Sequence, residues 1–443
     1  MKEKILFLVF VAGLLAGCAN TNTGATSQVT SFESSTTLSS QTTTYNHSNP
    51  SEDDADRNEL RLLTAQHGIV MTVGGETQDG CYSLDTYPDG TADIIFYDYQ
   101  TKQCVRLSSD ANLKHDPASS AYLPSFKGGA RCLVAGENLY VIKSGQPYTD
   151  ASVPGNDPIA RIYCMTLNGS ERTVMEYGSN VVFQWDACVA GDSEGALYTV
   201  LAVVDPKTTH TKYVLARLGK GIDGYETISE WDDEATVRLM GVCDSGFVIS
   251  KTYASEQGTK KLLEIYQKSG EPAQTLLEWD NTEVTGFTVF DNILYYTKSN
   301  DALIYTKSTS ESHTVSTIDT SCFVDFKPSI AIISSEVRDN HLILQLIQDE
   351  VHASYAALDI PSEKISPLLL YEGEGDEKTF VGIFAEGQDD FLVRIGKFTR
   401  SRTDYGLDGT MYRYDQGFED YVLISKQDYW NNKADYQRFD YYN

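Results

Sequence analysis

Residues Gly286–Asp319 read GFTVFDNILYYTKSNDALIYTKSTSESHTVSTID, and this stretch decides the fold class. β-Branched and tyrosine residues fill four short runs, and such residues suit a pleated, half-buried surface. Asn, Asp and Ser fill the positions between the runs, where turns form most readily. The stretch therefore predicts four strands joined by three tight turns. The predicted strands are Gly286–Phe290, Ile293–Lys298, Ala302–Lys307 and His313–Asp319.

The same pattern recurs along the chain about every 50 residues. Its most readable mark is a first hairpin, in which a Gly, Asp or Asn turn joins two apolar runs. No amphipathic helix separates the repeats. The pattern predicts an all-β β-propeller of seven four-stranded blades, because ring closure protects sheet edges. The predicted blades begin near residues 68, 128, 181, 236, 284, 329 and 379.

Six or eight blades, or a pair of β-sandwiches, are the alternative architectures. Ring closure is left open, because the last repeat supplies four runs of its own; Arg57–Ala65 is a candidate extra edge strand. The aromatic tail Gln427–Asn443 is expected to pack along the last blade, with a platform for sugars or a partner as the alternative. The blade rhythm over residues 65–425 resembles propeller domains of bacterial lipoproteins, including TolB-like and uncharacterised families.

The first 18 residues indicate export. Lys2 and Lys4 precede the apolar run Ile5–Leu15, which is shorter than the roughly 20 residues of a membrane-spanning helix. Leu15-Ala16-Gly17-Cys18 follows at once and resembles a bacterial lipobox. The resemblance implies that residues 1–17 form a lipoprotein signal peptide and that Cys18 carries lipid, palmitate included, on the mature N-terminus.

Residues 18–56 are predicted to be the lipidated cysteine and a disordered, Ser/Thr-rich tether, because the segment has almost no large apolar residue to bury. A flexible tether of this length averages roughly 30 Å end to end. Residues 57–443 then form the propeller domain, aromatic tail included. The expected location is the extracytoplasmic face of the cell membrane, at the cell surface and held by the lipid anchor.

The net charge of −28 comes from 35 Lys and Arg against 63 Asp and Glu. This acidity disfavours a nucleic-acid partner, whose affinity rests largely on cations that neutralise phosphates. No phosphate loop, dinucleotide fingerprint or HExxH motif is present, so no cofactor and no metal is predicted. Seven cysteines besides Cys18, in an odd number and without paired spacing, predict mostly free, buried thiols.

Two short motifs suggest chemistry, but each has a simpler interpretation. Gly191-Asp192-Ser193-Glu194-Gly195 matches the G-x-S-x-G pattern of a nucleophile elbow. That motif requires a strand-to-helix turn, whereas this one falls on a first-hairpin turn with a strand after it. Asp85, Asp89 and Asp93 lack the spacing of a calcium loop and favour a polar turn. No catalytic residue is therefore assigned.

Loops between second and third strands, and loops between blades, are expected to share the face over the central channel. The preferred function is a non-catalytic, monomeric protein- or glycan-binding scaffold, with a cell-envelope protein or glycan as partner. The alternative is a propeller-fold hydrolase or lyase acting on polysaccharide or cell-wall material. The candidate ligand-binding residues are Tyr148, Lys207, His210, Trp231, Trp279, Arg400 and Arg402.

Overall fold

The residues that the computed structural model describes all belong to one compact unit, within Asn58–Asn443. They are residues 60–64, 75–87, 90–108, 115–124, 130–145, 158–184, 187–256, 258–299, 303–310, 315–319, 330–347, 353–373, 378–405 and 411–441.

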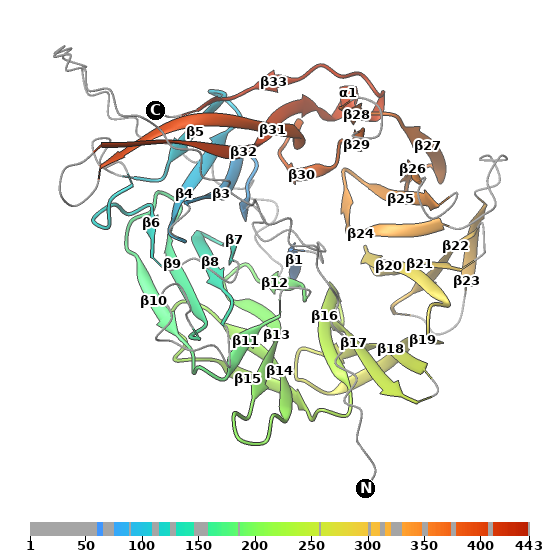
Figure 1. The fold of residues 1–443 in the computed structure, drawn as a ribbon. Helices are drawn as coiled ribbons and strands as arrows, with labels where there is room; N and C mark the ends of the chain where they lie inside the picture. Colours follow the sequence, from blue (N-terminus) through green and yellow to red (C-terminus); the bar gives the residue numbers. More distant parts are fainter. Residues whose placement is uncertain are drawn as a thin grey trace, which may run out of the picture. The chain divides into compact units, whose positions relative to one another are not determined.

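Seven blades, each built on an antiparallel four-stranded meander, follow one another around a common centre in the order of the sequence (Figure 1). Blade 1 contains β2 (Gly75–Glu76), β3 (Gly80–Thr86), β4 (Ala92–Asp98) and β5 (Gln103–Arg106). Blade 2 contains β7 (Ala130–Ala135), β8 (Asn138–Lys143), β9 (Arg161–Thr166) and β10 (Thr173–Glu176). Blade 3 contains β12 (Val189–Gly191), β13 (Leu197–Val204), β14 (Thr211–Leu218) and β15 (Glu226–Trp231).

The remaining blades repeat the same meander, which confirms the predicted seven-bladed β-propeller. Blade 4 contains β16 (Thr236–Cys243), β17 (Gly246–Ser255), β18 (Gly258–Gln267) and β19 (Pro272–Asp280). Blade 5 contains β20 (Val284–Phe290), β21 (Ile293–Lys298), β22 (Leu303–Ser308) and β23 (Val315–Asp319). Blade 6 contains β24 (Ile330–Arg338), β25 (His341–Ile347), β26 (Ala353–Asp359) and β27 (Lys364–Leu368). Blade 7 contains β30 (Ile383–Glu386), β31 (Asp390–Tyr405), β32 (Met411–Ser425) and β33 (Gln437–Arg438).

Blade 5 is the stretch that predicted the fold, and its strands pair in the order β20-β21-β22-β23. Its first turn consists of Asp291 and Asn292, both in the left-handed region, with φ of 46° and 60°. Asp339 and Asn340 repeat this geometry in blade 6, with φ of 47° and 57°. Two left-handed residues in a two-residue turn match the twist of the flanking strands, and Asn and Asp tolerate that conformation better than most residues.

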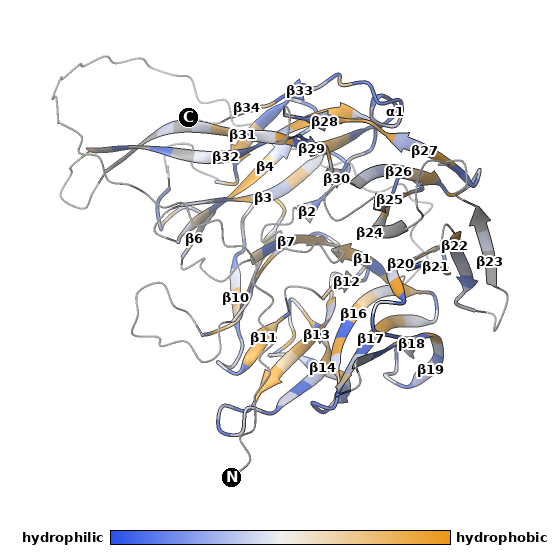
Figure 2. Ribbon diagram, turned by 45° about the vertical axis from the view of Figure 1, so that its right-hand side comes forward, coloured by the Kyte–Doolittle hydropathy of each residue, from blue (hydrophilic) through white to orange (hydrophobic). Residues whose placement is uncertain are grey.

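Hydrophobic cores lie between neighbouring blades, so both faces of an inner strand are buried. In β4, Ile94 and Phe96 join the core shared with blade 2, whereas Ile95 and Tyr97 join the core shared with blade 7. This alternation follows from the two-residue period of a strand. Figure 2 shows the resulting hydrophobic colour along inner strands such as β4 and β13.

The C-terminal tail joins the last blade to the first. After helix α1 (Lys426–Trp430), β33 pairs with β32 in blade 7, and β34 (Asp440–Tyr441) then pairs in parallel with β5 in blade 1. Between these strands, Phe439 is 6% exposed and lies 5.1 Å from the ring of Tyr97. The tail therefore closes the ring as a clasp, in addition to packing along the last blade as predicted.

One strand assignment was wrong in blade 7. Residues 421–426 were expected to form its fourth strand, but residues 421–425 continue β32, and the tail supplies the fourth strand instead. The candidate extra strand at Arg57–Ala65 is confirmed as β1 (Arg61–Thr64), which pairs with β12 at the inner edge of blade 3. Short strands β6 (Tyr122–Leu123) and β11 (Val181–Phe183) extend the sheets of blades 1 and 3, and β28 (Tyr371–Glu372) and β29 (Thr379–Phe380) form a separate two-stranded sheet.

The thiols in the described part of the chain are free and buried, as predicted; Cys18 and Cys322 lie outside the described residues. Burial raises the pKa of the Cys132 thiol, which keeps it protonated and unreactive near neutral pH. No helix among the described residues is long and apolar enough to cross a membrane. The free cysteines are Cys81, Cys104, Cys132, Cys164, Cys188 and Cys243.

Replacing Phe439 with Ala should weaken the clasp. The change removes a buried ring from the blade 1–blade 7 core, and we expect the free energy of unfolding to fall by about 3 kcal/mol. Urea denaturation followed by tryptophan fluorescence measures the loss. The control is Lys433→Ala, a tail residue whose side chain is 61% exposed and which should change stability by less than about 0.5 kcal/mol. Equal midpoints for the two variants would contradict a closing role for the tail.

Candidate functional site

Two connections of blade 3 meet at one side of the ring. The first is the turn between β13 and β14, and the second is the link from β15 to blade 4. His210 Nδ1 in the first lies 2.5 Å from Asp233 Oδ2 in the second, and both side chains are largely exposed. The predicted sharing of one side by these two kinds of connection holds here.

The β13–β14 turn is built around Asp205. Its carboxylate accepts hydrogen bonds from the backbone N–H groups of Lys207 and Thr208, at 2.8 and 3.4 Å. The hydrogen bond from the Lys207 N–H, followed by one from the Thr208 side chain, lowers the pKa of Asp205. Thr209 then turns the chain with φ of 62°. These bonds hold an otherwise solvated turn in one conformation and present His210 beside blade 4.

The two connections border a hollow of about 820 Å³, which we call the rim hollow. It contains five carboxylates, whereas its cationic group is Lys212, which pairs with Glu230 at 3.1 Å. A concave surface with this charge attracts ammonium or guanidinium groups. The rim hollow is lined by Asn180, Val203, Asp205, Pro206, His210, Thr211, Lys212, Val214, Tyr225, Thr227, Glu230, Asp232, Asp233 and Glu234.

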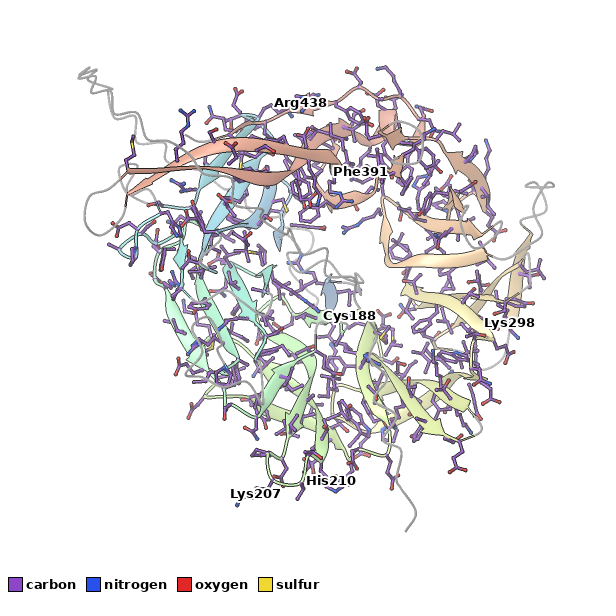
Figure 3. The ribbon with its side chains drawn as sticks, in the orientation of Figure 1. Cys188, Lys207, His210, Lys298, Phe391 and Arg438 are labelled. Atoms are coloured by element: carbon purple, nitrogen blue, oxygen red, sulfur yellow. The ribbon has the colours of Figure 1, made fainter. Side chains whose placement is uncertain are left out.

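The rim hollow lies at the periphery of the ring rather than over its centre. Figure 3 labels Lys207 and His210 at the outer end of the β13–β14 hairpin. Lys207 is exposed there. A smaller hollow of about 590 Å³ occupies the equivalent place in blade 4, where residues 253–262 face Asp280 and Asn281.

Trp231 was predicted as a ligand-binding residue, but it takes part in the contact between blades 3 and 4. Its Nε1 donates a hydrogen bond to the Tyr266 hydroxyl at 3.2 Å, and the two rings meet edge to face. Lys251 lies under both rings and contacts Glu264 at 2.8 Å. Burial opposes the charge of Lys251, but hydrogen bonds to Glu264 and Tyr266 outweigh it and raise the pKa of the ammonium group. Trp231 is therefore half-buried in the contact between the two blades.

The prediction for Trp279 was wrong. The side chain is 5% exposed and packs against Phe287 at 5.9 Å, within the core between blades 4 and 5. Trp231 and Trp279 do occupy equivalent positions, each near the end of a fourth strand. Their shared Trp-Asp pattern reflects packing on the next blade rather than an aromatic rim.

The other candidate residues are not brought together with the rim hollow. Cys18 and Tyr148 lie outside the described residues. Arg400 and Arg402 were expected on a loop, but β31 continues through both to Tyr405; their side chains lie outside the described set. The hairpin that carries them lies well away from the β13–β14 hairpin in both views (Figures 1 and 2).

A buried polar cluster in blade 1 was not predicted from the sequence beyond a polar turn around Asp85–Asp93. Asp93 is fully buried and contacts Arg106 at 2.9 Å, Tyr87 at 2.9 Å and His115 Nδ1 at 3.0 Å. His115 Nε2 meets the Thr91 hydroxyl at 2.7 Å, and its ring stacks on Tyr87. The partners neutralise the buried carboxylate and attach residue 115 to the blade, which indicates a structural role. The described residues hold no group of metal-ligating side chains here or elsewhere.

Comparison with known proteins gives no family. No protein-family model and no curated sequence matches the chain. Solved structures similar to it include a puromycin hydrolase, at 8% identity and a TM-score of 0.44, and prolyl endopeptidases, at 11% and 0.46. The matches cover 79% and 80% of this chain but only 58% and 55% of those proteins.

A third similar structure is the β-propeller domain of the Trilobed protease from Pyrococcus furiosus, described as having an open velcro topology. It shares 9% identity and a TM-score of 0.40, and the match covers 84% of this chain and 97% of that domain. The class of the protein, an all-β propeller of seven blades, is given by its own seven sheets.

The assignment of Trp279 to the core can be measured. Trp279→Ala should lower the free energy of unfolding by about 3–5 kcal/mol, because it empties a buried site between two blades. Lys207→Ala at the exposed turn should leave stability unchanged within about 0.5 kcal/mol. Chemical denaturation compares the two. If the Trp279→Ala protein were as stable as the parent, the core assignment would be contradicted and Trp279 would again be a candidate residue of the rim.

Proposed function

We propose that the chain is a lipid-anchored, extracytoplasmic binding module that holds a basic segment of a cell-envelope protein in the rim hollow of blade 3. The observation that carries the proposal is that a concave surface and a cluster of negative charges coincide at one place. A hollow of about 820 Å³ gathers five carboxylates around one paired lysine. The hydrogen bond to Asp205 and the contact between His210 and Asp233 brace its border.

A protein ligand is better supported than a glycan. Trp231 and Trp279 were the aromatic candidates for ligand binding, and sugars stack on exposed aromatic faces. Trp279 is buried, and Trp231 is bonded to Tyr266. Carboxylates remain as the dominant groups of the hollow, and they pair with Lys or Arg side chains through charge-assisted hydrogen bonds.

The hydrolase alternative requires a carboxyl group with a raised pKa to act as general acid. In the rim hollow, hydrogen bonds from Lys207 and Thr208 lower the pKa of the Asp205 carboxyl, which is the opposite of what a general acid needs. The geometry of the rim hollow therefore supports binding better than acid catalysis. Release of sugar or peptide products from cell-wall material by the purified chain would favour the alternative.

The rim hollow can be tested by removing its charge. The full chain is immobilised, and an octalysine peptide serves as the probe in a biosensor measurement. We expect Glu230→Gln combined with Asp232→Asn and Asp233→Asn to weaken binding at least tenfold, which corresponds to about 1.4 kcal/mol.

The matched control removes three other exposed carboxylates, with Glu171→Gln, Glu194→Gln and Asp435→Asn, whose side chains are 65–68% exposed. The control should change affinity by less than twofold. Equal weakening in both triple variants would show that the peptide senses only overall charge, and the rim hollow would then lose its role.

The lipid anchor is tested at Cys18. In cells fed with a radiolabelled or clickable palmitate, the parent chain should take up label and partition into detergent. Cys18→Ser removes the acceptor thiol, so both properties should disappear while the propeller stays folded. A single acyl chain binds membranes only marginally, so a multiply acylated terminus is expected. Label in the Cys18→Ser chain would contradict the lipobox interpretation.

A further inference from the structure

The hairpin of blade 7 is much longer than a blade requires. Strand β31 has 16 residues and β32 has 15. Strand β30 pairs with β31 only at residues 391–393, and β33 pairs with β32 only at residues 422 and 423. Beyond these pairs, residues 394–405 and 411–421 pair with one another alone; we call this part the arm.

The base of the arm is fastened to the ring by aromatic side chains. Phe398 stacks on Phe418 across the two strands at 5.4 Å and contacts Tyr441 of the clasp at 5.2 Å. Farther out, Ser401 is exposed, and Met411 is 62% exposed. Figure 1 shows the two strands projecting past blade 1. A two-stranded ribbon is marginal in water unless a third strand or a core supports it.

The outer edge of β31 is open over the arm. In the described part of the chain, no backbone group of residues 394–405 bonds to a strand other than β32. A row of free N–H and C=O groups on an extended strand is a template for another strand. Natural sheets protect such an edge with proline, a bulge or charged side chains. The arm has a bulge between Arg394 and Gly396 and carries cations, but residues 396–405 pair in unbroken register without proline, so the backbone edge beyond the bulge stays regular.

The charge of this edge indicates which kind of strand it binds. Residues 394–402, RIGKFTRSR, hold four cations and no carboxylate, in a chain of net charge −28. The strand that already pairs with them, residues 414–421 (YDQGFEDY), holds three carboxylates and no cation. Arg394 and Lys397 both contact Glu419, at 3.4 and 3.2 Å, while their side chains stay 51% and 75% exposed. A second acidic strand would meet the same cations from the open side.

We propose that the open edge of β31 binds an extended acidic segment of a partner protein as a third, antiparallel strand. The site lies on blade 7 and is independent of the rim hollow. Pairing with β31 of a second copy would oppose cations to cations, and like charges facing one another across strands are destabilising. The net charge of −28 also opposes approach of a second whole chain.

The test uses the full chain and a nine-residue peptide that alternates Glu with Thr or Val. The control peptide carries the same charge but has Pro at its centre, which removes a donor and disrupts strand pairing. We expect the strand-forming peptide to bind, and to slow amide hydrogen exchange at residues 394–405. Arg394→Gln combined with Lys397→Gln should weaken binding at least fivefold. Lys207→Gln combined with Lys433→Gln, two exposed lysines elsewhere, should leave it within twofold.

Three results would overturn the proposal. Equal binding of the proline peptide would show attraction by charge without strand pairing. Binding without slower exchange at residues 394–405 would place the peptide elsewhere. A concentration-dependent increase in mass of the chain, competed away by the peptide, would assign the edge to a second copy.

Discussion

Burial of both faces of every blade is the constraint on which the molecule depends. A four-stranded meander has too little apolar surface on one side to be stable alone, so each blade requires two neighbours. The consequence is visible in β4, where alternate residues from Ile94 to Tyr97 serve two different cores. The ring is the arrangement that gives every blade two neighbours. The clasp makes blades 7 and 1 neighbours of each other.

This constraint also explains which parts of the fold could be predicted from the sequence. The period of the strands and the Asp-Asn turns are local signals, and they located blade 5 to within about two residues of β20–β23. Closure is not local: β34 pairs with β5, more than 330 residues earlier, and two-residue strands leave almost no pattern. The length of β31 was not predicted, because Ser, Thr and Arg residues occur both in strands and in long polar loops.

The candidate site was predictable only in part, for a related reason. Loop position followed from blade topology, so Lys207 and His210 were found beside the link to blade 4. Side-chain burial could not be predicted from blade topology. The same Trp-Asp sequence has a half-buried tryptophan at Trp231 and an enclosed one at Trp279. The polar cluster around Asp93 depends on His115 from a distant turn, and no spacing rule connects them.

The clasp sets an order on assembly. Residues 440 and 441 are made more than 330 residues after β5, and blade 1 needs them to cover its outer strand. A growing chain therefore keeps the outer edge of β5 exposed until residues 440 and 441 are made, and long-range pairing of this kind forms slowly. Chains cut short near the C-terminus would keep that edge and be prone to aggregate.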